Sequence, residues 1–139
     1  MAQELDLSNI YKLNNADEWQ AFIGYTNKEQ QFVGFPLAMV MYEADHCHFC
    51  REALPLVNEL AGIYRGIIAV GLVDLDSKSM IVAGTPLAPG EAEGKTIIKG
   101  VTGTPQFWMY KLGKSVDHIS GKDNDTLKKM FAYWASNRS

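Results

Sequence analysis

Residues 37–50 read LAMVMYEADHCHFC, an unbroken apolar run that leads through a short polar stretch into two cysteines separated by two residues. An apolar run of this kind predicts a β-strand over 37–42 that is covered on both faces. From Phe49 onward apolar residues recur at helical spacing as far as Tyr64, and Gly66 lies just past the expected helix end. The stretch therefore predicts a strand, the two cysteines and a helix in direct succession.

The chain after this helix extends the pattern into an α/β fold. Residues 67–73 are apolar and β-branched, so strand, helix and strand form a right-handed crossover with parallel strands. An antiparallel hairpin is expected over 106–110 and 115–119. A last helix is expected to begin after a cap at Asp123 or Asn124, with Leu127, Met130, Phe131 and Trp134 on one face.

The chain before the apolar run predicts one more helix and a short strand. Asn15 is followed three residues later by Glu18, which indicates a capped helix over 16–24. Residues 10–13 just before it predict an edge strand, and the polar stretch 26–31 predicts a loop.

Length and composition exclude several protein classes. The 139 residues predict a single domain over 1–139, and 47% hydrophobic with 21% charged residues is ordinary globular usage. The formal charge of −3 argues against a nucleic-acid partner. Apolar stretches are broken well before the ~20 residues of a membrane span, and the N-terminus carries acids where a signal peptide carries bases. We expect a cytoplasmic monomer with no membrane partner.

The two cysteines are expected to do chemistry. A bridge between Cys47 and Cys50 closes almost no loop and barely constrains the unfolded chain, so a purely structural disulfide is disfavoured. At a helix N-terminus the free N–H groups favour thiolate over thiol, which predicts Cys47 as the nucleophile. Cys50, one turn into the helix, is then the resolving thiol that attacks the mixed disulfide.

Two other interpretations of the cysteines stay open. A zinc site needs two further ligands, and the histidines available are His46, His48 and the distant His118. Adjacent residues of one loop do not easily supply four tetrahedral ligands, so we expect no metal. The remaining interpretation is a pair of buried neighbouring cysteines without function.

These elements together resemble the thioredoxin family over nearly the whole chain. Strand, C-x-x-C, helix and strand are followed by a Thr-Pro that precedes a hairpin and a terminal helix. The resemblance rests on Cys47-His48-Phe49-Cys50, Pro55 five residues later, Thr104-Pro105 before the strand 106–110, and turn glycines at Gly113 and Gly121.

The resemblance implies a thioredoxin-like α/β fold with a central mixed sheet of four to five strands flanked by helices. It implies a thiol-disulfide oxidoreductase in electron transport that acts on protein disulfides, draws on a thioredoxin- or glutathione-reducing system, and has no cofactor. Pro105 would be the cis-proline beside the disulfide, and Thr104 would offer backbone hydrogen bonds to an extended substrate. His46, His48 and Phe49 would flank the disulfide and contact substrate. Thr85-Pro86 competes for the cis-proline position but leads into a loop.

The chain departs from the family at several positions. The family's buried Asp and its partner Lys fall on Met41 and Leu72, so the usual proton acceptor for the resolving thiol is missing. His46 replaces the usual Trp, and a protonated imidazole there would stabilise the Cys47 thiolate. The segment 77–100 holds at most a short helix near Met80 and is longer than in most thioredoxins. Because it connects the strand ending near Asp76 to the loop that carries Pro105, we expect it to form a flap near the active site that helps to choose partners.

Glu43 is the nearest carboxylate that can replace the missing acid. Residues of a strand alternate faces, so Glu43 shares the face of Met41 and lies nearer the cysteines. Burial there would raise its pKa and suit it as a proton acceptor, whereas an outward orientation would leave it without a role.

Two other functions stay open. A glutaredoxin-like, glutathione-dependent reductase is favoured slightly by Gly113-Lys114, but the paired glycines and Asp that hold the tripeptide are missing. A non-catalytic thioredoxin-fold binding module would explain the missing acid and base, but the retained cysteines argue against it.

Overall fold

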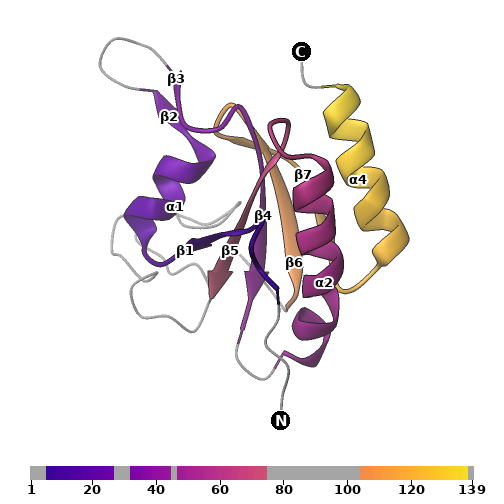
Figure 1. Cartoon of the computed structure of the whole chain (residues 1–139). Helices are drawn as coiled ribbons and strands as arrows, with labels where there is room; N and C mark the ends of the chain where they lie inside the picture. Colours follow the sequence, from indigo (N-terminus) through magenta and orange to yellow (C-terminus); the bar gives the residue numbers. More distant parts are fainter. Residues whose placement is uncertain (1–5, 27–31, 45–46, 75–103, 138–139) are drawn as a thin grey trace.

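The computed structural model describes residues 6–26, 32–44, 47–74 and 104–137, and everything below refers to these residues. Five strands form one sheet in the order β1-β5-β4-β6-β7 (Figure 1). Strands β1, β5 and β4 run parallel to one another, and β6 is antiparallel to both β4 and β7. The predicted mixed sheet is confirmed, with bounds β1 Tyr11–Leu13, β4 Leu37–Glu43, β5 Ala69–Asp74, β6 Gln106–Lys111 and β7 Lys114–Ser120.

Three helices cover the two faces of this sheet. Helix α1 (Ala16–Ile23) lies on one face, and α2 (His48–Ile63) and α4 (Asn124–Ser136) lie together on the other (Figure 1). The predicted caps are confirmed, since the Asn15 side chain accepts from the Glu18 amide and that of Asp123 accepts from the Thr126 amide. None of the described helices is long and apolar enough to cross a membrane.

Strand β4 is the centre of the core. Leu37, Met39 and Met41 pack against the face covered by α2 and α4. Ala38, Val40 and Tyr42 alternate with them and pack towards α1. This period of two, with apolar residues on both faces, is why the run 37–42 is continuously hydrophobic.

Two predicted boundaries are wrong. Thr26 was expected in a loop, but it pairs with Phe32 in a separate two-stranded ribbon of β2 (Tyr25–Thr26) and β3 (Phe32–Val33). The strand expected from Ile67 begins at Ala69, because the Ile67 and Ile68 amides both donate to the Tyr64 carbonyl in the turn after α2. The segment 77–100 and its expected short helix lie outside the described residues.

Candidate active site

The two cysteines lie at the start of α2, a few residues after the end of β4. Cys47 is the N-cap residue of α2, and its Sγ accepts a hydrogen bond of 3.1 Å from the Cys50 amide. The two sulfurs are bonded, with an S–S distance of 2.11 Å and a Cα–Cα distance of 5.2 Å. A sulfur therefore occupies the place where a Ser or Asp side chain usually caps a helix. An amide donor at that place stabilises negative charge on the Cys47 sulfur when the bond is reduced.

The two sulfurs differ in access. Cys47 is half-buried, whereas Cys50 is 1% exposed and belongs to the core cluster beneath α2. A substrate sulfur can therefore approach Cys47 but not Cys50. This asymmetry agrees with the order of attack expected from the sequence.

Thr104 and Pro105 lie at the same end of the sheet as the disulfide. The peptide bond between them is cis, and Pro105 is buried. Gln106 directly follows and pairs with Tyr42 near the end of β4, five residues before Cys47. The Pro105 carbonyl accepts from the Gly121 amide at 2.8 Å, which ties this turn to the end of β7.

The surface beside the disulfide is formed by the first turn of α2. The side chain of His48 is 78% exposed, and that of Phe49 is 57% exposed, so both face outward next to Cys47. His48 Nε2 lies 2.8 Å from Glu52 Oε1, and Lys122 Nζ lies 3.1 Å from Glu52 Oε2. The hydrogen bond from Lys122 lowers the pKa of the Glu52 carboxyl, and His48 contributes in the same direction. His46 lies outside the described residues.

An apolar pair occupies the two positions at which the resemblance to thioredoxins predicts a buried acid and base. Met41 and Leu72 are register partners on β4 and β5, and both are buried against α2. The next register pair of the same face, Glu43 and Asp74, brings two carboxylates together at the end of the sheet nearest the cysteines. Glu43 is half-buried.

Glu43 and Asp74 line a cavity of about 300 Å³ together with Arg51, Leu54 and Leu72. Arg51 follows Cys50 directly in α2, so the cavity joins the second cysteine's turn to the two carboxylates. The sequence alone named Glu43 as a candidate proton acceptor but did not name Asp74 or Arg51, which line the same cavity. The signals that could have found them are an acid at the end of the second parallel strand and a base next to Cys50.

Metal-ligating side chains do not gather in the described part of the chain. No group of three or more His, Cys, Asp or Glu side chains there is placed to hold a metal ion. His118, one of the histidines considered for zinc, stacks on Trp108 with ring centroids 4.3 Å apart and belongs to β7.

Similarity to known proteins covers nearly the whole chain. The chain is 23% identical over 128 residues to a thioredoxin H-type of Chlamydomonas reinhardtii, which covers 92% of this chain and 96% of that one. It is 26% identical over 100 residues to thioredoxin 1 of Plasmodium falciparum, covering 72% and 82%. The solved structure of a Plasmodium falciparum thioredoxin superposes with a TM-score of 0.66 at 22% identity, over 89% of this chain and 98% of that one. Over nearly its whole length the chain is similar to thioredoxins in sequence and in fold.

No protein-family model matches the chain. The predicted fold is confirmed by the structural similarity. Thiol-disulfide oxidoreductase activity is supported by the two thioredoxin relatives and by the Cys47–Cys50 disulfide at the start of α2.

Proposed function

We propose that the protein exchanges dithiol and disulfide with protein substrates, with Cys47 as the nucleophile and Cys50 as the resolving thiol. One observation carries the assignment: the half-buried Cys47 sulfur caps α2 and accepts the Cys50 amide, while the Cys50 sulfur lies in the core. The helix terminus stabilises a thiolate at Cys47, and burial raises the cost of a charge at Cys50. The first attack therefore belongs to Cys47.

The reaction in the reducing direction has two exchange steps. The Cys47 thiolate attacks one sulfur of the substrate disulfide, that S–S bond breaks, and the other substrate sulfur leaves as a thiolate that takes a proton. Cys50 then loses its proton and attacks Cys47 Sγ, which releases the second substrate thiolate. Two electrons pass from the dithiol to the substrate, and the product on the protein is the Cys47–Cys50 disulfide.

The substrate chain is proposed to lie across the surface beside the disulfide. In this proposal Thr104 and Pro105, which precede β6, flank the surface on one side, and His48 and Phe49 of α2 flank it on the other. Backbone groups of Thr104 would pair with an extended substrate segment, and the exposed Phe49 ring offers an apolar contact. His46 is assigned to the same surface by its place before Cys47.

Glu43 is proposed as the proton acceptor for Cys50. Its support is the cavity that Glu43 shares with Asp74, Arg51 and Leu54, on the same side of the sheet as α2. A water in this cavity would relay the proton to the carboxylate. The Arg51 guanidinium would favour the ionised carboxylate that can accept it.

The partner that restores the dithiol is proposed to be a thioredoxin- or glutathione-reducing system. A measured reduction potential decides the direction of electron flow, because about −270 mV indicates a reductant and about −120 mV an oxidant. The cytoplasmic location, the monomeric state and the role in electron transport stay predictions from the sequence.

Trapping of the mixed disulfide tests the assignment of the two cysteines. In the Cys50→Ser variant the second step is blocked, so a covalent Cys47–substrate adduct should accumulate when the reduced protein meets a protein disulfide. In the Cys47→Ser variant no adduct should form, and no turnover should be detected. Non-reducing gels and mass spectrometry of the adduct provide the readout.

The opposite pattern, an adduct in Cys47→Ser and none in Cys50→Ser, would reverse the roles. If the wild-type protein binds oxidised partners but never exchanges with them, the protein is a non-catalytic binding module. Turnover that depends on glutathione alone would instead support the glutaredoxin-like alternative.

A further inference from the structure

A second and larger cavity lies at the opposite end of the sheet from the disulfide. Its volume is about 620 Å³, and its walls include Leu37 and Ala69, the first residues of β4 and β5. The disulfide follows the other end of β4, and the seven residues of this strand span roughly 20 Å. The cavity is therefore separate from the redox site.

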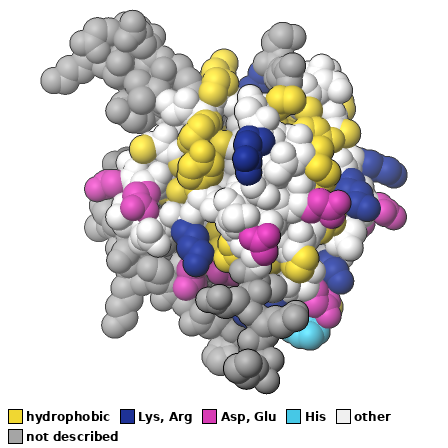
Figure 2. Space-filling model, viewed as in Figure 1, with side chains coloured by type: hydrophobic (Ala, Val, Ile, Leu, Met, Phe, Trp, Pro, Cys, Tyr) yellow, Lys and Arg dark blue, Asp and Glu magenta, His cyan; other side chains and the backbone are white. Residues whose placement is uncertain are grey.

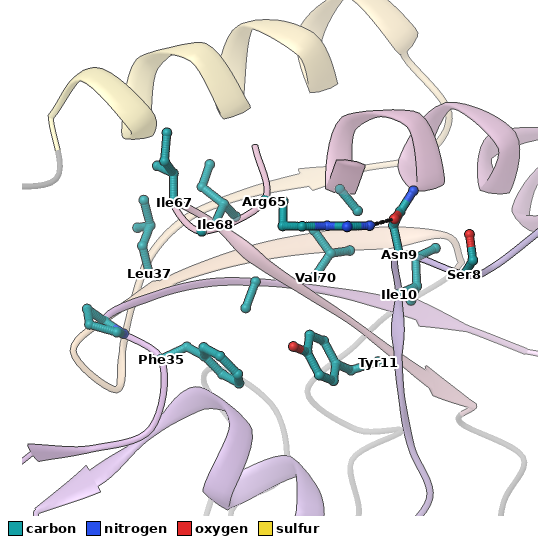
Figure 3. A pocket seen from close by; sticks show the side chains of 14 residues that line it. Ser8, Asn9, Ile10, Tyr11, Phe35, Leu37, Arg65, Ile67, Ile68 and Val70 are labelled. Atoms are coloured by element: carbon teal, nitrogen blue, oxygen red, sulfur yellow. Dashed lines mark hydrogen bonds between the residues drawn. The ribbon is translucent and has the colours of Figure 1, made fainter. Parts of the chain in front are cut away.

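The walls of this cavity are mostly apolar. Tyr11, Phe35 and Ile67 are 53%, 38% and 36% exposed, and these three large hydrophobic side chains converge on it. In Figure 3 the Tyr11 and Phe35 rings lie along one side of the cavity, with Ile67 and Ile68 across from them. The ring centroids of Tyr11 and Phe35 are 5.5 Å apart. Figure 2 shows hydrophobic side chains gathered on the upper part of this view, with the visible acidic side chains at mid-height and below.

One cationic side chain crosses this apolar surface. Arg65 lies in the turn after α2, and its Nη2 donates to Asn9 Oδ1 (Figure 3). Asn9 is itself fixed, since its amide donates to Asn58 Oδ1 at 2.9 Å and its Nδ2 donates to the Asn58 carbonyl at 3.2 Å. Asn58 is buried in α2. The guanidinium is therefore held in position from the core outward.

No Asp or Glu of the described residues forms an ion pair with Arg65. The described residues that line the cavity include no Asp or Glu. In the described part of the chain, Asn9 is the one polar side chain that contacts the guanidinium. A guanidinium carries five N–H donors, so most of them remain for a ligand. A carboxylate matches two parallel N–H groups of an arginine in a bidentate arrangement.

We propose that this cavity binds a small amphipathic carboxylate, a molecule with one acidic group and an aliphatic or aromatic body. The acid would pair with Arg65, and the apolar body would lie against Tyr11, Phe35 and Ile67. Cavities of 300 to about 1,000 Å³ with apolar walls and few polar anchors are the usual form of small-molecule sites. Three exposed hydrophobic side chains around one fixed cation are accounted for by such a ligand.

Titration of the full-length oxidised protein with octanoate tests the proposal. Amide chemical shifts should change in a saturable way at residues of the cavity, such as Val70 and Ile67, and not around Cys47. Octan-1-ol has the same chain without the charge, and it should bind at least tenfold more weakly, because charge-assisted hydrogen bonds are about twice as strong as neutral ones.

Three variants locate the binding determinant. Arg65→Gln should weaken octanoate binding about tenfold or more. Asn9→Asp keeps Arg65 but supplies it with a carboxylate, and it should weaken binding to a similar extent. Lys128→Gln removes an exposed charge from α4 and should leave the affinity unchanged.

The absence of saturable shifts in the cavity would overturn the proposal. So would equal affinities for octanoate and octan-1-ol, or an unchanged affinity in both Arg65→Gln and Asn9→Asp. Disulfide exchange by Arg65→Gln should equal that of the wild type, so this result is independent of the proposed redox function.

Discussion

Met41 and Leu72 lie directly across from one another on the parallel strands β4 and β5, and both are buried beneath α2. Most thioredoxins are expected to carry an acid and a base at these two places. The two positions are register partners in one apolar cluster, so a charged side chain at one position would lie next to the side chain at the other. The two apolar residues are therefore expected to occur together, because a single buried charge at either position would lack a partner of opposite charge.

A carboxylate placed alone at this position should be strongly destabilising. Met41→Asp puts a charge or an unpaired acid at a site that is 0% exposed, and we expect the free energy of unfolding to fall by about 3 kcal/mol or more. Met41→Leu conserves volume and should cost less than about 1.5 kcal/mol. Urea unfolding of the oxidised protein measures both.

The double variant Met41→Asp with Leu72→Lys tests whether the pair acts as a unit. Its destabilisation should be smaller than the sum of the two single variants by about 1 to 3 kcal/mol. Additive costs would mean that the two side chains do not contact each other once charged.

The proposed proton acceptor predicts a defect in the second exchange step alone. Glu43→Gln keeps the shape of the side chain and removes the carboxylate, so resolution of the mixed disulfide should slow by about 100-fold or more, in line with general base catalysis. The first attack by Cys47 should change little. Rapid-quench measurement of the mixed disulfide between pH 6 and about 9, a range that includes the free-thiol pKa of about 8.5, separates the two steps.

Asp74 provides the matched control, because it is the register partner of Glu43 and lines the same cavity. Asp74→Asn removes an equal charge from the neighbouring strand. If both variants slow resolution equally, the effect belongs to the net charge of the cavity and not to Glu43. Unchanged resolution in Glu43→Gln would remove Glu43 from the mechanism.

Local patterns were enough to predict most elements of the fold. The caps at Asn15 and Asp123, the alternation along 37–42 and the position of Cys47 at a helix start are set by neighbours in the sequence. They depend on side-chain chemistry within a few residues, so the structure confirms them. The boundary at Ile67 was wrong because a turn hydrogen bond to Tyr64 competes with strand pairing.

The features that could not be predicted join residues far apart in the sequence. Whether Glu43 faces Asp74 depends on the register of two strands separated by a whole helix, which no local pattern sets. The second cavity brings Asn9, Phe35 and Arg65 together from three segments. The contact between the Tyr42 and Tyr110 hydroxyls likewise joins two strands that are far apart in the sequence.

Acid should weaken the cap of α4. The Thr126 amide donates to the Asp123 carboxylate at 3.0 Å and lowers the pKa of that group. A lowered folded-state pKa stabilises the protein above the unfolded value of about 3.9, and this stabilisation is lost as pH falls through the folded pKa. Asp123→Ala should be less stable than the wild type at pH 7, with the difference shrinking below about pH 4. Asp123→Asn keeps an acceptor and should lose less stability, as thermal unfolding across pH 2 to about 7 will show.

Tyr42 is the central member of a buried hydrogen-bonded cluster with Trp19 and Tyr110 on the α1 side of the sheet. Its hydroxyl accepts from Trp19 Nε1 at 2.9 Å and lies 2.6 Å from the Tyr110 hydroxyl. Burial raises the pKa of both phenols well above their ordinary value. A raised folded-state pKa means that stability is full below about pH 10 and falls above it, because the unfolded chain then ionises first.

The two tyrosines should therefore differ when their hydroxyls are removed. Tyr42→Phe leaves both the Trp19 N–H and the Tyr110 hydroxyl buried without their partner, and the expected loss is about 2 to 6 kcal/mol, since each unsatisfied group costs about 1 to 3. Tyr110→Phe leaves the bond between Trp19 and Tyr42 intact and should cost about 1 kcal/mol. Tyr133→Phe, at an exposed ring on α4, should stay within about 0.5 kcal/mol of the wild type. Denaturant unfolding ranks the three, and equal losses in Tyr42→Phe and Tyr110→Phe would show that the bond from Trp19 contributes nothing to stability.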